Sequence, residues 1–279
     1  MANKIIISAS RKEDMIANLE SYNQLQNILK EGIYTQNSRF DGFSNKVIDL
    51  NNIGAIVLWS KDYSNFLKNP LLLDNYNLYF QFTITGYNKI IEKGVIDTNI
   101  AIKQMEELAK RYNPNQINWR FDPIGFFNCQ IENKFKSFSK ERLNTFENMC
   151  KKISSFGVNR CTISFVTYYT YVKNRLESQN IKYFIPSSEQ KVLFLEKLKE
   201  IATKYNIELY ACSNPEMQKA NIKPSSCIDG NILEKLFNIK FSKSKDNSQR
   251  SDCHCSKSID IGNYKFCKHL CIYCYNSTI

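Results

Sequence analysis

Six short apolar segments, separated by longer segments with helical spacing, constrain the fold of this chain more than any other feature. The six are rich in β-branched and aromatic residues and are apolar throughout, as expected of strands buried on both faces. Because parallel strands need crossovers long enough to hold a helix, the alternation predicts a parallel sheet built from βα units. The predicted strands span residues 4–9, 55–59, 78–85, 116–121, 161–166 and 207–211.

The segments between these strands carry apolar residues three and four positions apart, the spacing of helices that bury one face. The last of the predicted helices is expected to begin with a capping box formed by Ser187 and Gln190. The four predicted buried faces consist of Met15, Leu19, Tyr22, Leu25 and Leu29; Ala101, Met105, Leu108 and Tyr112; Leu143, Phe146, Cys150 and Ile153; and Phe194, Leu198, Ile201 and Tyr205.

Six βα units make either a partial TIM-type barrel or an open doubly wound sheet. We favour the barrel, because a doubly wound fold is expected to carry a glycine-rich turn after its first strand. Only nine glycines occur, and none forms GxGxxG or a phosphate-binding loop. The predicted architecture is therefore an α/β fold, with a partial TIM-type (β/α)6 barrel over residues 1–241. A cysteine-rich C-terminal cap over residues 242–279 is expected to pack on the barrel mouth.

The charge and hydropathy of the chain indicate which compartment and which partners to expect. Its 38 lysines and arginines exceed its 27 aspartates and glutamates, which gives a net charge of +11 over 279 residues. The basic residues are spread along the chain, and this favours a solvated surface over a nucleic-acid footprint. The sequence has neither a signal-like start nor an apolar run long enough to cross a bilayer. We therefore expect a cytoplasmic protein without a membrane partner, in which clustered cysteines bind metal rather than form disulfides.

Three cysteines near the C-terminus form the strongest chemical motif. Cys267, Cys271 and Cys274 have the spacing CxxxCxxC, and Tyr273 directly precedes the last of them. Three thiolates this close can hold three irons of a [4Fe-4S] cubane and leave the fourth iron open to another ligand. Zinc is the alternative, with a CxxC knuckle completed by a histidine or by cysteines nearby. We favour the cluster because CxxxC is an uncommon spacing for zinc.

The other cysteines divide into two sets. Four near the C-terminal end can close a second, fully ligated iron–sulfur cluster or a structural zinc site, or they can be ordinary buried thiols. These four are Cys212, Cys227, Cys253 and Cys255. Cys129, Cys150 and Cys161 fall on or beside predicted core elements, and we interpret them as packing residues.

The CxxxCxxC spacing with its aromatic residue resembles the cluster motif of the radical S-adenosylmethionine (SAM) superfamily. The resemblance implies that the open iron chelates the amino and carboxylate groups of SAM, and that Tyr273 packs near the adenine. An electron passed through the cluster would cleave SAM to a 5′-deoxyadenosyl radical, which abstracts a hydrogen from a substrate. Such an enzyme would receive its electron from a donor such as flavodoxin or ferredoxin. Its substrate, a small molecule or a nucleic acid, is not identified.

Polar residues at the carboxyl ends of the predicted strands are further candidates, because a barrel of βα units builds its active site there. Arg11 and Arg120 are candidate catalytic residues whose planar forks suit a substrate anion or the SAM carboxylate, with Asp122 or Asp14 orienting one of them. A structural pair of Arg120 and Asp122 is the alternative. Lys61 belongs either to the site or to a solvated helix start. The candidate cofactor-binding residues besides Tyr273 are Ser8, Ser10, Thr83 and Ser164.

Scattered short motifs occur along nearly the whole chain. They are ISASR at 7–11, WSK at 59–61, QFTITG at 81–86, WRFDP at 119–123, ISF at 163–165, CIDG at 227–230, KDNSQR at 245–250 and CHC at 253–255. In this order they resemble a bacterial family known as domain of unknown function 1848. The resemblance is more specific than CxxxCxxC alone, and it implies the architecture and the cluster without naming a reaction.

The chain differs from ordinary radical SAM enzymes in where its motif lies. Their cysteines usually follow the first strand, where this chain has Ser8–Arg11, and a Gly-Gly-Glu motif after the second strand is absent. A tail folded back over the barrel mouth would bring the cysteines to the same place. The expected function is a radical SAM-like enzyme of unknown substrate. The alternative is a zinc- or cluster-stabilised nucleic-acid-binding or processing protein, motivated by the net charge, the basic segment 243–250 and the tyrosines at 168–171.

Overall fold

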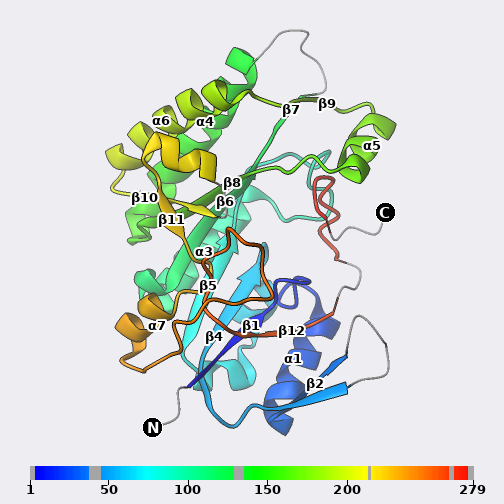
Figure 1. Cartoon of the computed structure of the whole chain (residues 1–279), viewed down its shortest axis with the longest axis vertical. Helices are drawn as coiled ribbons and strands as arrows, with labels where there is room; N and C mark the ends of the chain where they lie inside the picture. The colour runs from blue at the N-terminus through cyan, green and yellow to red at the C-terminus, as the bar shows by residue number, and fades with distance from the viewer. Residues whose placement is uncertain (1–3, 38–44, 129–134, 213–214, 264–266, 276–279) are drawn as a thin grey trace.

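Eight strands form one sheet in which all neighbouring strands are parallel (Figure 1). The computed structural model describes residues 4–37, 45–128, 135–212, 215–263 and 267–275. Across the sheet the order is β11 (Lys223–Ser225), β10 (Glu208–Cys212), β8 (Arg160–Phe165), β6 (Ile117–Ile124), β5 (Leu78–Thr83), β4 (Ile53–Ser60), β1 (Ile5–Ala9) and β12 (Ile259–Ile261).

All six predicted strands are present, and they lie side by side in chain order. This sequential order is the one expected of βα units added in a single direction, not the reversed order of a doubly wound sheet. Two short strands, β11 and β12, extend the edges and were not predicted. Within the described residues no ladder joins these two edges. The chain is thus a mixed α/β fold with a large parallel sheet, and closure into a barrel stays a prediction.

The strand β12 belongs to the C-terminal segment that we expected to form a separate cap. It pairs in parallel with β1, with Ile7 opposite Ile259 and Ala9 opposite Ile261. The segment that follows β12 therefore leaves the sheet at the same edge as the segment that follows β1. Whether residues 1–241 and 242–279 are separate units stays a prediction.

Helices and two antiparallel strand pairs complete the described fold. The pairs are β2 (Ile33–Asn37) with β3 (Asn45–Asp49), and β7 (Phe126–Asn128) with β9 (Lys182–Phe184). The α-helices are α1 (Leu19–Glu31), α2 (Ser64–Lys68), α3 (Thr98–Arg111), α4 (Phe135–Ile153), α5 (Thr170–Ser178), α6 (Ser188–Lys204) and α7 (Gly230–Phe237).

The predicted helix starts are partly right. The capping box of Ser187 and Gln190 is present at the start of α6. At α1 the first turn was predicted too early, because Asn18 caps the helix by accepting from the backbone amides of Glu20 and Ser21. Met15 is therefore buried ahead of the helix, and Leu19 is 60% exposed rather than part of the buried face.

The main core lies between one face of the sheet and the helices α1, α3, α4 and α6. At its centre the ring of Trp119 on β6 stacks on Phe146 of α4, with ring centroids 5.2 Å apart and planes 14° apart. Cys150 and Cys161 are buried in this core, as predicted for packing residues, while Cys129 lies outside the described residues. Two smaller apolar clusters contain the other described cysteines except Cys267, and both are built partly from C-terminal residues.

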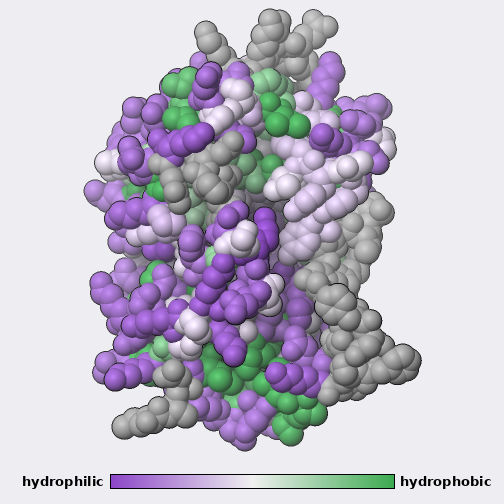
Figure 2. Space-filling model, viewed as in Figure 1, coloured by the Kyte–Doolittle hydropathy of each residue, from purple (hydrophilic) through white to green (hydrophobic). Residues whose placement is uncertain are grey.

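The surface is consistent with a chain rich in scattered charged residues. The face in Figure 2 is largely hydrophilic across its middle, and apolar residues gather mainly towards its lower end. In the part of the chain that the structure describes, every helix is too short or too polar to span a bilayer.

Truncation of the aromatic stack tests the central position of α4 on the sheet. We expect Phe146→Ala to lower the free energy of unfolding by about 3–5 kcal/mol, because it removes a fully buried ring and leaves a cavity. Leu193→Ala on α6 is the control, since that side chain is 57% exposed. Urea denaturation followed by circular dichroism measures both, and equal losses in the two variants would contradict the packing described.

Candidate functional site

Residues 267–275, which we call the cysteine loop, pack against the segment that follows β5. The amide of Gly94 donates to the carbonyl of His269 at 2.9 Å, and the amide of Ile272 donates to the carbonyl of Ile91 at 3.0 Å. A β-carbon at Gly94 would lie 1.9 Å from the carbonyl oxygen of Lys268. Glycine is therefore required there, because the backbone of the cysteine loop occupies the space of a side chain.

A buried carboxylate fixes this loop to the carboxyl ends of β4 and β5. Oε1 of Glu92 accepts from Nζ of Lys61 at 2.8 Å and from Oγ1 of Thr85 at 2.7 Å, and the hydroxyl of Tyr273 donates to the same oxygen. Burial by itself raises the pKa of Glu92, but the charge of Lys61 and these hydrogen bonds lower it below the usual value. Lys61 is thus a buried member of the site rather than a solvated helix start.

A second anchor joins the cysteine loop to the segments after β1 and β4. Oδ2 of Asp14 lies 2.6 Å from Nε2 of His269, and the same carboxylate accepts from Oγ of Ser60 at 2.8 Å. Lys268 also pairs with Asp62 at 3.0 Å. Asp14, which we expected to orient an arginine, therefore holds the histidine between two of the motif's cysteines.

The three thiols of the cysteine loop lie in a confined and electrostatically coupled region. Cys271 is 6% exposed, and burial raises the pKa of its thiol, while the nearby charge of Lys61 acts in the opposite direction. Burial, together with the charges of Asp14 and Cys274, raises the pKa of Cys267 to about 11. Each of these thiols would bind metal as a thiolate. At Cys271, the positive charge of Lys61 stabilises the thiolate.

The choice between a cubane and a single ion at the cysteine loop stays a prediction. Among the described residues, no three histidine, cysteine, aspartate or glutamate side chains surround a position that one metal ion could take. A cubane does not need such a position, because each thiolate binds a different iron. Nδ1 of His269 is buried without a hydrogen-bond partner among the described residues, so a group bound at this loop would meet an unsatisfied polar atom.

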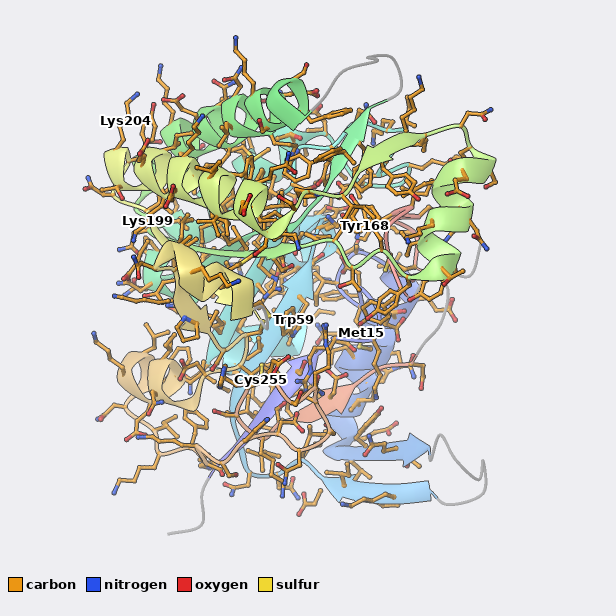
Figure 3. All side chains as sticks on the ribbon, turned by 45° about the horizontal axis from the view of Figure 1, so that its top comes forward. Met15, Trp59, Tyr168, Lys199, Lys204 and Cys255 are labelled. Carbon is orange, nitrogen blue, oxygen red and sulfur yellow. The ribbon has the colours of Figure 1, made fainter. Side chains whose placement is uncertain are left out.

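The other four C-terminal cysteines come together on the opposite face of the sheet from the main core. Sγ of Cys212, at the end of β10, lies 3.3 Å from Sγ of Cys227, which precedes α7. Cys227 and Cys253 lie near Cys255 in one small buried cluster, and their thiols raise its pKa. We call these residues the four-cysteine group. Figure 3 labels Cys255 and Trp59, which contribute to the same small apolar cluster.

Arg120 and Asp122 form a buried ion pair, and their catalytic role stays a prediction. Nε of Arg120 donates to Oδ1 of Asp122 at 2.9 Å, and Nη2 donates to Oδ2. Nη1 contacts Sγ of Cys227 at 2.9 Å and the side chain of Gln81. The fork of Arg120 is therefore already engaged. Burial raises the pKa of Asp122, although the charge of Arg120 acts against that rise.

Arg11 joins the segment after β1 to the C-terminal segment. Its Nη2 donates at 3.0 Å both to Asp246 and to Ser258, and its backbone amide donates to Asp260 at 3.0 Å. Through these contacts Arg11 holds the segment 246–260 beside the segment that follows β1. Its predicted role towards an anion stays a prediction.

The predicted cofactor-binding residues all lie towards the carboxyl ends of strands, but they make different contacts. The ring of Tyr273 lies parallel to that of Phe127, with centroids 6.2 Å apart, and is almost fully buried in the cluster around the cysteine loop. The remaining four contact other parts of the rim. The hydroxyl of Ser8 accepts a hydrogen bond from the indole of Trp59, and that of Ser10 accepts one from the amide of Lys12. The hydroxyl of Ser164 donates to Asp122, and Thr83 lies opposite Arg120 in the ladder of β5 and β6.

Sequence reasoning missed the importance of Glu92 and His269. Glu92 lies in the irregular segment between β5 and α3, where no motif or period marks one carboxylate above another. His269 offered a better signal, since it is one of two histidines in the chain and lies inside the cysteine motif.

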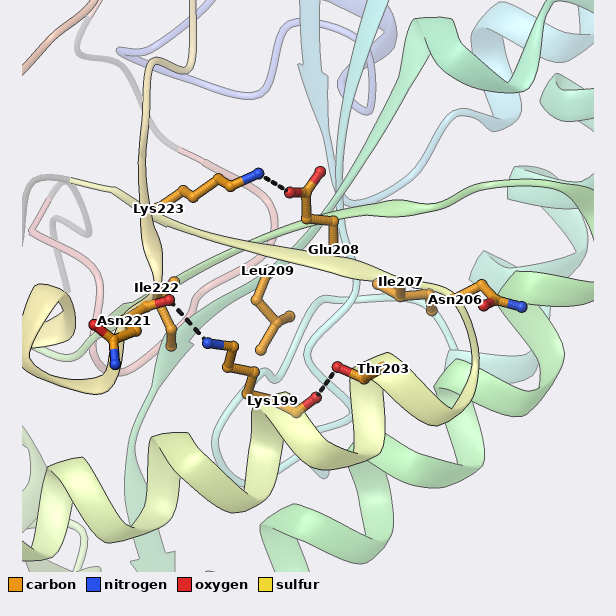
Figure 4. Close-up of a pocket in the computed structure, with 9 residues that line it drawn as sticks. All are labelled: Lys199, Thr203, Asn206, Ile207, Glu208, Leu209, Asn221, Ile222 and Lys223. Carbon is orange, nitrogen blue, oxygen red and sulfur yellow. Dashed lines mark hydrogen bonds and ion pairs between the residues drawn. The ribbon is translucent and has the colours of Figure 1, made fainter.

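A surface hollow lies away from these residues. It has a volume of about 370 Å³ and is lined by the end of α6 and by residues at the amino ends of β10 and β11 (Figure 4). An ion pair between Lys223 and Glu208 and a hydrogen bond from Lys199 to the carbonyl of Asn221 cross it. Active sites of βα folds form at the opposite ends of the strands, so we place the candidate site at the cysteines and not in this hollow.

The comparisons with known proteins identify a family and no activity. A family model described as domain of unknown function, DUF1848, matches residues 6–276. The chain belongs to this family. The match confirms the resemblance seen in the scattered sequence motifs, and no curated protein matches the sequence. A solved structure described as L-ribulose 3-epimerase aligns with 86% of this DUF1848 chain and 68% of its own, at 8% identity and a TM-score of 0.37. That likeness is too low to support an argument.

A substitution that adds a side chain at Gly94 tests how the cysteine loop packs against the segment that follows β5. We expect Gly94→Ala to displace the loop, because the new methyl group would overlap the carbonyl of Lys268. The rate of alkylation of Cys271 by iodoacetamide, mapped by mass spectrometry in metal-free protein, should rise several-fold. Gly54→Ala is the matched control, since it crowds Lys4 and Phe241 at the other end of the sheet. An unchanged rate in Gly94→Ala, or an equal rise in both variants, would contradict the packing described.

Proposed function

We propose that this DUF1848 protein is a radical SAM-like enzyme in which Cys267, Cys271 and Cys274 bind a [4Fe-4S] cluster. The observation that carries the proposal is the anchoring of the cysteine loop at the carboxyl ends of β1, β4 and β5, through the contacts of Asp14 with His269 and of Glu92 with Lys61. In a fold built from βα units, this edge is where active sites form. Ordinary radical SAM enzymes present their cysteines after the first strand, and this loop lies beside that segment.

Residues of this chain would prepare the thiols for metal. The buried ammonium of Lys61 interacts with the thiol of Cys271, and its charge offsets that of a thiolate. Glu92 keeps Lys61 in place, and because Tyr273 donates to the same carboxylate, the ligand loop and its counter-charge are positioned together. When bound and reduced, the cluster would supply the electron for the cleavage of SAM.

The rim around the loop offers groups for SAM and a substrate. Hydroxyls of Ser8, Ser10, Thr83 and Ser164 and the cation of Arg11 are the candidate contacts there. Arg120 would act as a fixed positive charge, since Asp122 and Cys227 already occupy its fork. Flavodoxin or ferredoxin is the proposed class of electron donor, and the substrate class is open.

Anaerobic reconstitution with iron and sulfide tests the function directly. We expect the protein to become brown, to hold about four irons per chain at this motif, and to cleave SAM to 5′-deoxyadenosine when a strong reductant is added. Cys271→Ala should lose the iron of this motif and the cleavage activity. Cys150→Ala removes a thiol buried in the main core and should retain both.

Two outcomes would overturn the proposal. The first is iron-loaded protein that leaves SAM intact under strong reductant. The second is colourless protein that carries zinc at the cysteine loop and binds RNA or DNA with an affinity that falls steeply as salt rises, which would favour the nucleic-acid alternative.

A further inference from the structure

We propose that the four-cysteine group binds one zinc ion, separately from the cysteine loop, and that this ion fastens the C-terminal segment to the sheet. The ligands come from three parts of the chain: Cys212 from the end of β10, Cys227 from the turn before α7, and the pair Cys253 and Cys255 from the segment before β12. None of the four forms a disulfide.

The spacing of the sulfur atoms favours a single ion over a cubane. Zinc takes four thiolates at about 2.3 Å in a tetrahedron, and this geometry places neighbouring sulfurs about 3.8 Å apart. Sγ of Cys212 and Sγ of Cys227 are 3.3 Å apart, and Cys253 and Cys255 belong to the same small buried cluster. A cubane spreads its ligands over separate irons and so holds them further apart.

The metal-free arrangement is more compact than the liganded one would be. Sγ of Cys212 and Sγ of Cys227 are in direct contact, and no three described side chains surround a ready position for an ion. Because 3.3 Å is shorter than the tetrahedral edge, zinc would enter by separating the sulfurs by a few tenths of an ångström. The movement is small for side chains contributed by turns and by the end of a strand.

Hydrogen-bond donors around the group suit bound thiolates. Nη1 of Arg120 contacts Sγ of Cys227 at 2.9 Å, and the amide of Ile228 donates to Sγ of Cys255 at 3.5 Å. Four thiolates exceed the charge of one zinc ion by two units, so a buried cation beside them is stabilising. Arg120 supplies that cation, and this gives it a role that does not depend on a substrate.

The segment between α7 and β12, which the ion would fasten, has little regular secondary structure to hold it in place. Between α7 and β12 the chain forms no helix or strand among the described residues. Backbone hydrogen bonds from Asp246 to Cys255 and from Ser256 to Ile228, both 2.8 Å, hold it beside the turn before α7. Its apolar cluster is small compared with the main core. Structural zinc contributes folding free energy directly in such segments.

Metal analysis of three variants, each expressed with iron and zinc present and purified without oxygen, tests the site. The triple variant C267A/C271A/C274A removes the ligands of the cysteine loop and should retain about one zinc per chain. Adding C253S/C255S to it should abolish that zinc, whereas adding Cys150→Ala should leave it. A chelator should lower the melting temperature of the triple variant only while its zinc is present.

Cobalt replacement keeps the test decisive even if the five-fold variant fails to fold. The triple variant, stripped of zinc and given Co²⁺ alone, should show the intense thiolate-to-cobalt absorption of a four-sulfur site. Triple variant that holds iron and sulfide instead of zinc, holds no metal, or binds cobalt without sulfur ligation would overturn the proposal. None of these outcomes depends on whether the protein cleaves SAM, so the two proposals succeed or fail separately.

Discussion

The buried ion pair of Lys61 and Glu92 connects the sheet to the part of the chain that carries the chemistry. Lys61 follows β4, Glu92 follows β5, and Tyr273 of the cysteine loop donates to the carboxylate of the pair. Removing one partner of a buried pair commonly costs about 3–5 kcal/mol, because the other charge is left without compensation. The position of the cysteine loop therefore depends on an interaction that is stable only when both strands and the loop are in place.

The two faces of the sheet differ in the kind of side chain that they bury. One face is covered by α1, α3, α4 and α6 and forms an apolar core of conventional kind. The other face carries buried polar side chains that are joined to one another by hydrogen bonds. These are Gln81, Asn118, Arg120 and Thr162. A buried polar network is stable only if its members are satisfied, and Cys227 contributes to this one through its contacts with Arg120 and with Gln81.

Sequence reasoning predicted the strands well and the site less completely. Apolar segments such as 78–85 and 161–166 are recognisable because both faces of these strands are buried, and their short length and richness in β-branched and aromatic residues distinguish them from helices. The short strands β11 and β12 have three residues each, too few for any period to be visible. The cysteines were found from spacing, and the family from scattered motifs. The role of Glu92 and the contact of Arg120 with Cys227 were not foreseen, because the partners are 31 and 107 residues away along the chain.

The pairing of β12 with β1 has a consequence for the order of assembly. Strand β1 lies inside the sheet only because a strand made some 250 residues later comes to cover its edge. During synthesis, domains generally fold from the N-terminus onwards, so the helix-covered face of the sheet can form while the outer edge of β1 is still unpaired. The last cysteines emerge after every strand of the sheet. The cluster site that we propose at the cysteine loop is therefore completed only after all eight strands of the sheet have been made.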